Sequence, residues 1–239
     1  MNNLLDSLVQ ISEKYDINIL EIKDIEAKKT YERMNIKYKK WKTENPNLDK
    51  IIFIEEEIKD AIIDLLYYLA NFITTYDVMY QNELINEENY SDMKKLLLKE
   101  DKRFFKLQTY ILTTVSEFSI KAYQDFYHIY NKHRIIDWKF LVKMLISEYF
   151  EYRFVFCIKN NINFENVESS YYSFSNIFNI IFKELFKNFE NVEEFKLMFE
   201  LIHKQNMLKI FKDGYFHFDI NNCNKVIKPN NWNNVISKL

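Results

Sequence analysis

The chain has 239 residues, a net charge of −2, one glycine, two prolines and a hydrophobic share of 48%. This hydrophobic share excludes an intrinsically disordered chain, and the near-neutral charge excludes general attraction to nucleic acid or anionic lipid. The shortage of glycine excludes glycine-rich phosphate loops and disfavours all-β folds with tight hairpins, because both use residues with positive φ. We therefore predict an all-α fold.

Hydrophobic residues recur at helical spacing along nearly the whole chain, which predicts a single helical domain over residues 1–239. Pro46 marks the clearest break, and Asp49 is placed to cap the helix that follows it. The predicted helices cover residues 4–11, 19–41, 50–83, 93–132, 138–158, 175–188 and 191–213. A bend near 99–101 would divide the fourth of these, so we expect one bundle of seven or eight helices. A helical arm formed by residues 1–46 is an alternative.

Asparagines and the single glycine predict several helix ends. Asn160 and Asn161 tolerate the left-handed conformation and are predicted to end the helix before them. Asn191 resembles the first residue of a capping box and is predicted to open the last long helix. Gly214 is predicted to stop that helix as a C-terminal cap. Residues 215–220 are then expected to form a short strand or an irregular segment.

Cysteine usage and the N-terminal sequence bear on the compartment. Cys157 and Cys223 are far apart without CxxC spacing, which argues against a zinc site and against a disulfide-built scaffold. The N-terminal residues show no basic segment followed by an apolar run, so no signal peptide is predicted. No run of about 18 apolar residues is present, so no membrane span is predicted. We expect a cytoplasmic protein.

A row of acidic residues on the predicted helix 50–83 is the sharpest chemical feature of the sequence. Glu57, Asp60 and Asp64 follow one another at spacings of three and four residues, so they share one face of a helix. Asp64 lies among apolar residues, where a carboxylate either faces solvent or is held by a cation, a tyrosine hydroxyl or a metal ion. The row is either a cation site or a structural feature whose negative charge favours the start of the helix.

The segment DLLYYLANFI, at 64–73, resembles the metal-binding helix of MazG-like nucleotide pyrophosphohydrolases, in which an ExxD motif precedes a short apolar stretch that often ends in YLA. The resemblance implies an all-α enzyme that holds Mg²⁺ between two pairs of acidic residues and cleaves nucleoside triphosphates to monophosphates. Asp64 matches the aspartate of this motif, while Ala61 stands where the family has glutamate. The upstream ExxE pair of the family has its nearest counterpart in Glu21 and Asp24.

The spacing of carboxylates and histidines suggests a second metal hypothesis. Carboxylate-bridged di-iron bundles use two ExxH pairs and two further glutamates from other helices. The candidate residues are Glu200 with His203, Asp125 with His128, and the ExxE pair Glu148 and Glu151. One such pair is expected by chance in a chain this rich in acidic residues, so spacing alone does not decide the matter.

A basic run with interleaved aromatic residues occupies residues 28–42. Its candidate partner-binding residues are Lys28, Lys29, Arg33, Lys37, Lys39, Lys40, Trp41 and Lys42. On one helix these side chains could grip an acidic protein or the phosphates of a nucleic acid. The alternative is a solvated helix face beside the acidic helix that follows.

The absence of glycine-dependent catalytic motifs favours binding over catalysis. We expect a non-catalytic helical protein without a cofactor that acts by binding another macromolecule, most simply another protein. An immunity protein, inhibitor or accessory protein of a bacterial or phage conflict system fits this description. It also fits the abundance of Asn, Ile, Lys, Phe and Tyr, which is typical of an A/T-rich genome. Two alternatives stay open: a Mg²⁺-dependent MazG-like hydrolase, and a nucleic-acid-binding protein that uses residues 28–42.

Overall fold

A computed structural model describes residues 19–82, 87, 91, 105–130, 138–161, 187–222 and 225–232. Of these residues, 79% are helical and only one small pair of strands is present, which confirms the mostly helical fold. The described ranges hold five α-helices, so the predicted count of seven or eight is not matched in them. The helix predicted at 4–11 and most of the one predicted at 175–188 lie outside the described residues.

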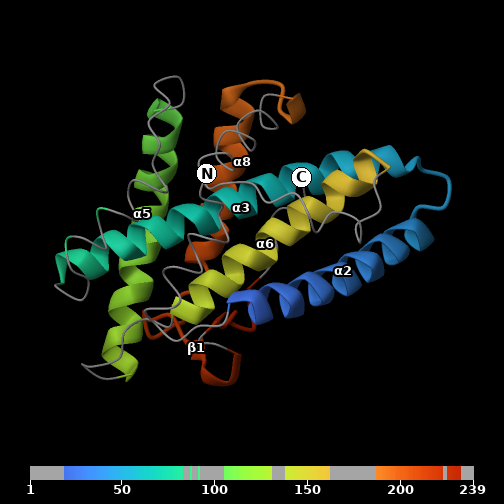
Figure 1. The fold of residues 1–239 in the computed structure, drawn as a ribbon. Helices are drawn as coiled ribbons and strands as arrows, with labels where there is room; N and C mark the ends of the chain where they lie inside the picture. The colour runs from blue at the N-terminus through green and yellow to red at the C-terminus, as the bar shows by residue number, and fades with distance from the viewer. Residues whose placement is uncertain are drawn as a thin grey trace. The chain divides into compact units, whose positions relative to one another are not determined.

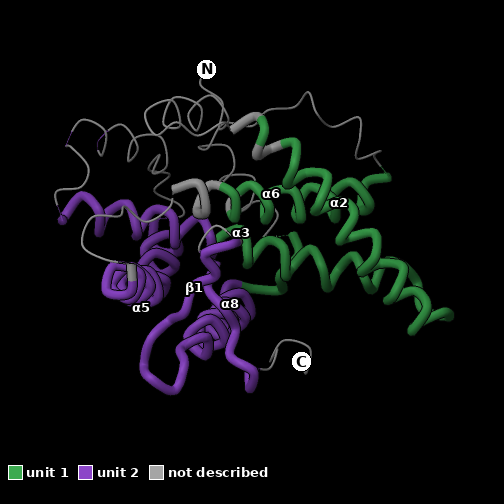
Figure 2. Tube along the Cα trace, turned by 90° about the horizontal axis from the view of Figure 1, so that it is seen from below, with its two compact units in different colours: residues 1–66, 142–191 green, residues 67–141, 192–239 purple. Residues whose placement is uncertain are grey.

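The chain forms two compact units, coloured separately in Figure 2. Unit 1 comprises residues 1–66 and 142–191, and unit 2 comprises residues 67–141 and 192–239. Helix α3 (Lys50–Gln81) contributes its first part to unit 1 and its second part to unit 2. The sequence did not indicate these two units, because no linker and no change of composition marks the points where the chain passes from one unit to the other.

Unit 1 contains helix α2 (Ile19–Glu44), the first part of α3 and nearly all of helix α6 (Trp138–Lys159), which Figure 1 shows beside one another. A short turn reverses the chain between α2 and α3. Lys50 Nζ, at the start of α3, donates to Asn161 Oδ1, just beyond the end of α6, at 3.4 Å. Helix α6 therefore runs antiparallel to α3 and parallel to α2. Met34, Phe53 and Val155 are fully buried in this unit.

Local hydrogen bonds explain where the helices of unit 1 begin and end. The Asp49 carboxylate accepts the backbone N–H of Ile51 at 2.9 Å, which confirms the predicted cap of α3. Asn45 closes α2 by donating both its backbone N–H and its side-chain amide to the carbonyl of Trp41. Asn161 has a φ of 53°, so the predicted left-handed end of α6 is also confirmed.

Unit 2 contains the second part of α3, helix α5 (Phe105–Tyr130) and helix α8 (Val192–Met207). Its core is aromatic: Phe72, Phe195, Phe199 and Phe216 are all fully buried. The Phe195 and Phe199 rings lie one turn apart on α8, with centroids 5.6 Å from each other. Helix α8 begins directly after Asn191, where the sequence predicted its start.

The last long helix was predicted to run to Asp213, and this is wrong, because α8 ends at Met207. Gly214 has a φ of 86° and lies in a separate turn, in which its N–H donates to Phe211 O at 2.9 Å. This turn brings Tyr215 back to Phe211, whose N–H bonds to Tyr215 O at 2.9 Å. Gly214 therefore serves a turn and not a helix cap.

The segment after Gly214 contains the expected short strand, together with the partner that a strand requires. Strand β1 (Phe218–Asp219) pairs antiparallel with β2 (Lys225–Val226), with Phe218 opposite Val226. A single 3-10 turn, η2 (Ile220–Asn222), follows β1. Among the helices of the described residues, none combines the length and the apolar character needed to cross a membrane.

Candidate functional site

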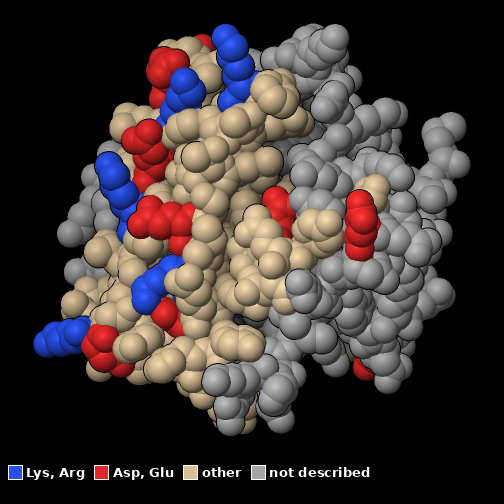
Figure 3. All heavy atoms as spheres, turned by 90° about the vertical axis from the view of Figure 1, so that its left-hand side faces the viewer, with Lys and Arg blue, Asp and Glu red and all other residues tan. Residues whose placement is uncertain are grey.

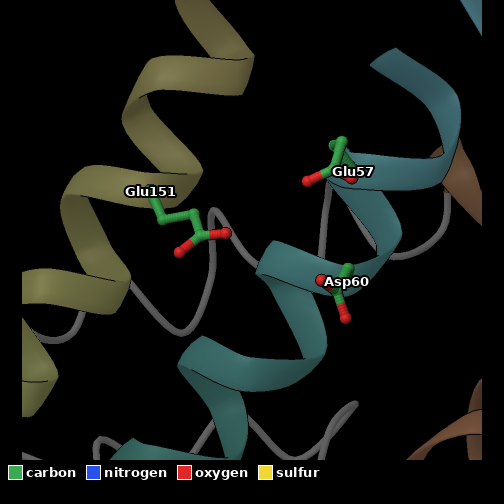
Figure 4. Close-up of side chains that lie close together, drawn as sticks. All are labelled: Glu57, Asp60 and Glu151. Atoms are coloured by element: carbon green, nitrogen blue, oxygen red, sulfur yellow. The ribbon is translucent and has the colours of Figure 1, made fainter. Parts of the chain in front are cut away.

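Three carboxylates converge in unit 1, as Figure 4 shows. Glu57 and Asp60 come from α3, and Glu151 comes from α6. One oxygen of each lies within 4.8 Å of an oxygen of each of the others. Within the described ranges this is the one group of three or more His, Cys, Asp or Glu side chains placed closely enough to hold a metal ion.

The helices place these groups by simple periodicity. Glu57 and Asp60 are three residues apart, so one turn of α3 presents both to the same neighbour. Because α6 runs antiparallel to α3, its middle lies beside this turn and contributes Glu151. The same face of α6 carries Glu148 three residues earlier, and Glu148 and Glu151 are both buried.

Two basic side chains of α2 complete the cluster. Lys37 Nζ hydrogen-bonds to Glu57 Oε2 and lies 3.9 Å from Asp60 Oδ2. Arg33 Nη2 hydrogen-bonds to Glu151 Oε2. The two cations are about half exposed, with 43% of the Lys37 and 53% of the Arg33 side chain accessible, whereas Glu57 and Glu151 are largely covered.

The electrostatics of the cluster show negative charge in excess. Burial raises the pKa of Glu57, and Asp60 and Glu151 raise it further, against the opposing effect of Lys37. Burial also raises the pKa of Asp60, with the Glu151 carboxylate adding to the effect. The pKa of Lys37 is raised as well: burial alone would lower it, but the carboxylates of Glu57, Asp60 and Glu151 outweigh burial. Three carboxylates thus share two cations.

The cluster is one end of a polar seam between α2 and α6. The seam consists of Glu26 with Lys143 at 3.8 Å, Thr30 with Ser147 at 3.4 Å, and Arg33 with Glu151. Its members recur at spacings of three or four residues on each helix, so the two helices meet along matching polar stripes. The seam sets the register of α2 against α6 and holds Arg33 and Lys37 at the carboxylates.

The acidic residues predicted from the sequence fall partly inside this cluster. Glu57 and Asp60 belong to it, and Asp64, one turn further along α3, does not. Glu21 and Asp24, the nearest sequence counterpart of an upstream acidic pair, are exposed near the start of α2 and lie outside it. Sequence reasoning missed Glu151 as the partner of Glu57 and Asp60. The signal that could have found it is the Glu148–Glu151 pair, which has the ExxE spacing.

The basic run divides between two faces of α2. Arg33 and Lys37 turn toward the carboxylates, and the Trp41 ring packs against Phe53 with centroids 5.3 Å apart. Five other members are exposed: Lys28, Lys29, Lys39, Lys40 and Lys42. Two of these form ion pairs with acids of the same helix, Lys29 with Glu26 and Lys40 with Glu44. Lys42 Nζ donates to Leu48 O at 2.9 Å.

Positive and negative side chains of the described residues lie near one another on the surface (Figure 3). On the face drawn in Figure 3, acidic and basic side chains of the described residues are interspersed over its charged part. The described residues on this face form no field of one sign. Charge-driven binding by these described residues would therefore depend on a local group of side chains.

The residues of the di-iron hypothesis do not converge in the described part of the chain. The Asp125 carboxylate accepts the backbone N–H of Phe216 at 2.8 Å and pairs with Lys121 at 2.9 Å. The His128 ring stacks on Tyr215 with centroids 5.3 Å apart. These side chains hold the C-terminal segment against α5 and do not form a metal site.

Comparison with known proteins adds no assignment: no family model, no curated protein and no solved structure matches this chain.

Proposed function

We propose that the protein is a divalent-cation-dependent hydrolase that cleaves a phosphate anhydride of a nucleotide, with Glu57, Asp60 and Glu151 as metal ligands. The observation that carries the proposal is the meeting of these three carboxylates within 4.8 Å of one another. Mg²⁺ takes oxygen ligands at about 2.1 Å in octahedral geometry, so two ligand oxygens on one ion lie about 3 to 4 Å apart. The donor set suits such an ion, and the carboxylate oxygens, which lie within 4.8 Å of one another, would draw together around it.

The charge balance supports a cation at this position. With all groups ionised, the three carboxylates carry three negative charges and Lys37 with Arg33 carry two positive ones. Burial raises the pKa values of Glu57 and Asp60, and the carboxylate of Glu151 raises them further. A divalent cation would relieve the mutual repulsion of the carboxylates, as nearby opposite charge favours their ionised form.

The spacing of the acidic residues supports the class of reaction. Glu57 with Asp60 has the ExxD spacing, and Glu148 with Glu151 has the ExxE spacing, on two antiparallel helices of one unit. The resemblance of residues 64–73 to MazG-like enzymes implies two acidic pairs of this kind. In this chain the first pair stands one turn before the matching aspartate, and the second lies on α6 instead of upstream.

Each residue has a defined part in this proposal. A bound Mg²⁺ would supply a Lewis acid for phosphoryl oxygens and lower the pKa of bound water. Glu57, Asp60 and Glu151 would hold the Mg²⁺ ion. Glu148 is buried one turn before Glu151 on the same face of α6 and would add negative charge beside it. Arg33 and Lys37 are accessible cations beside these ligands, suited to bind the phosphates of a substrate.

The proposal is tested by nucleotide hydrolysis with Mg²⁺ or Mn²⁺, followed as release of pyrophosphate from each of the common nucleoside triphosphates. We expect cation-dependent release that E57Q and E151Q reduce at least tenfold, as the loss of one metal ligand requires. E56Q is the matched control, because Glu56 is the exposed neighbour of Glu57 on the same helix. Absence of hydrolysis with every nucleotide, or equal rates in E57Q and E56Q, would contradict the proposal.

A second candidate function, binding of another macromolecule, is favoured by the outward face of α2. Lys28, Lys29, Lys39 and Lys40 are exposed there, and Ile36 between them is 68% exposed. These positions fall within about 120° of one side of the helix, next to the stripe that faces α6. An exposed isoleucine among lysines suits an acidic protein partner, as in an immunity, inhibitor or accessory role.

This second candidate is tested by reversing charge on the outward face of α2. A partner captured by the wild-type protein should be lost by the double variant K28E/K39E and kept by K212E, a reversal at an exposed lysine of unit 2. Equal capture by both variants would contradict binding through this face. Capture of RNA or DNA instead, with affinity that falls steeply as salt rises, would replace the protein partner with a nucleic acid.

A further inference from the structure

Three leucines of helix α8 form an exposed apolar row on the side opposite its buried phenylalanines. Leu197 is 60% exposed, and Leu208, just beyond the end of the helix, is 55% exposed. The two are eleven residues apart, about three helical turns, and the N–H of Leu208 still bonds to Lys204 O at 3.1 Å, as in a helix. They therefore lie on one face, with the half-buried Leu201 between them. We call these three side chains the leucine face.

Residues of opposite charge border the central part of the leucine face. Glu193, in the first turn of α8, has 80% of its side chain exposed, and Lys204, in the last turn, is exposed. They too are eleven residues apart, so they lie on the same edge of the face. Within the described part of the chain Lys204 forms no ion pair, and Glu193 pairs with Lys196, one turn away at 3.4 Å. Surface pairs of that kind contribute little stability, so Glu193 can exchange Lys196 for another cation.

This pattern is complementary to itself when two copies of α8 lie antiparallel. A twofold axis midway between Glu193 and Lys204 places each of them opposite the other on the second copy, so two ion pairs form at once. Leu197 and Leu201 lie on either side of this axis, so the leucines of the two copies meet between the ion pairs. A parallel arrangement would instead bring like charges together at both ends, which is unfavourable.

We propose that the protein forms a homodimer through the leucine face, with the two α8 helices antiparallel. A second copy of this chain therefore covers the exposed leucines, and burial of their apolar surface drives the association. An apolar centre with a charged rim is the common anatomy of a protein interface. The proposal concerns unit 2 alone and does not depend on the carboxylate cluster of unit 1.

The size of the leucine face sets the strength of the dimer. A helix of 16 residues is about 24 Å long and about 10 Å wide, so its face offers far less than the roughly 800 Å² per partner of a standard interface. The dimer should therefore be weak and should form at micromolar concentrations or above.

The test is sedimentation equilibrium of the wild type, L197E and I220E from micromolar to near-millimolar concentration. We expect the average mass of the wild type to rise from that of one chain, 29.4 kDa, toward twice this value. L197E should weaken association about tenfold or more, because it places a carboxylate in the apolar centre. I220E is the matched control, because Ile220 is a 64% exposed residue of unit 2 outside α8. A wild type that stays at the mass of one chain throughout, or equal association of L197E and the wild type, would overturn the proposal.

Charge reversal tests the antiparallel arrangement. E193K and K204E each bring like charges together across the axis and should each weaken the dimer, while the double variant E193K/K204E restores both ion pairs in reversed order. We expect the double variant to associate more tightly than either single variant. A double variant as weak as the single ones, or single variants that associate like the wild type, would overturn antiparallel pairing through α8.

Discussion

Replacing Lys37 with methionine tests whether the carboxylate cluster is only an ion-pair network or can bind a metal cation. The variant K37M keeps the linear stem and removes the ammonium that bonds to Glu57 and lies 3.9 Å from Asp60. The carboxylate cluster would then face Arg33 alone. Hydrogen bonds to charged groups contribute about 1.5–3 kcal/mol. Because 43% of the Lys37 side chain is exposed, solvent screening reduces this to about 1 kcal/mol.

The pH dependence of K37M has a definite sign. The pKa values of Glu57 and Asp60 are raised in the fold, so ionising these groups costs stability as the pH rises from their ordinary values through the folded-state values. Lys37 offsets part of that cost. The deficit of K37M should therefore be largest near neutral pH and should shrink toward pH about 4, where the carboxylates take up protons.

Divalent cations should reverse the deficit of K37M. A ligand present at about 100 times its dissociation constant stabilises a fold by about 2.7 kcal/mol. Because the variant no longer has the ammonium competing for the same carboxylates, Mg²⁺ should stabilise K37M more than the wild type. The assay is urea unfolding of wild type, K37M and the exposed-lysine control K39M, each with and without MgCl₂. Equal stability of K37M and K39M in both conditions would show that Lys37 does not offset the charge of the carboxylates.

Three further predictions concern unit 2. D125A removes the acceptor of the buried Phe216 N–H and should lower the free energy of unfolding by about 1–3 kcal/mol, whereas an unchanged urea midpoint would show that the contact contributes nothing. F199A empties a fully buried site and should cost about 3–5 kcal/mol by the same assay; a loss below about 1 kcal/mol would mean that the core collapses into the space. G214A meets no atom within 4 Å but must adopt a φ of 86°, so a cost of about 1 kcal/mol from backbone strain is expected in thermal unfolding, and a neutral result would contradict that strain.

Local signals in the sequence predicted the helices of unit 1 well. The break at Pro46, the cap at Asp49 and the left-handed end at Asn161 all depend on a residue's own conformational preferences or on a neighbour a few residues away. Such preferences act whatever the rest of the chain does. The boundaries of α2 and α3 were therefore close to the observed ones.

The end of α8 could not be predicted in this way, because long-range contacts decide it. Apolar residues continue at helical spacing to Phe211, which favoured a longer helix. In the structure the segment turns so that Phe216 becomes fully buried and its N–H reaches Asp125, 91 residues earlier. Tertiary packing overrides the local pattern there, and Gly214 supplies the turn.

In the candidate site, too, the residues of one helix were predictable from local spacing, whereas the residue from a distant helix was not. Glu57 and Asp60 were recognisable from their spacing on one helix. Glu151 was recognisable only as half of an ExxE pair, because nothing local indicates that the middle of α6 lies beside the second turn of α3. The basic run was predicted to be either a partner-binding surface or a solvated face beside the acidic helix. Helical periodicity alone did not reveal that Arg33 and Lys37, half exposed, pair with the carboxylates.

Titration with Mn²⁺, followed by the loss of its free electron paramagnetic resonance signal, tests the central claim most directly. The account predicts saturable binding of one ion per chain to the wild type and to E56Q, and binding at least tenfold weaker in E151Q, which removes the ligand contributed by α6. Binding that E151Q leaves unchanged, or no binding to the wild type, would show that the meeting of Glu57, Asp60 and Glu151 is not a metal site.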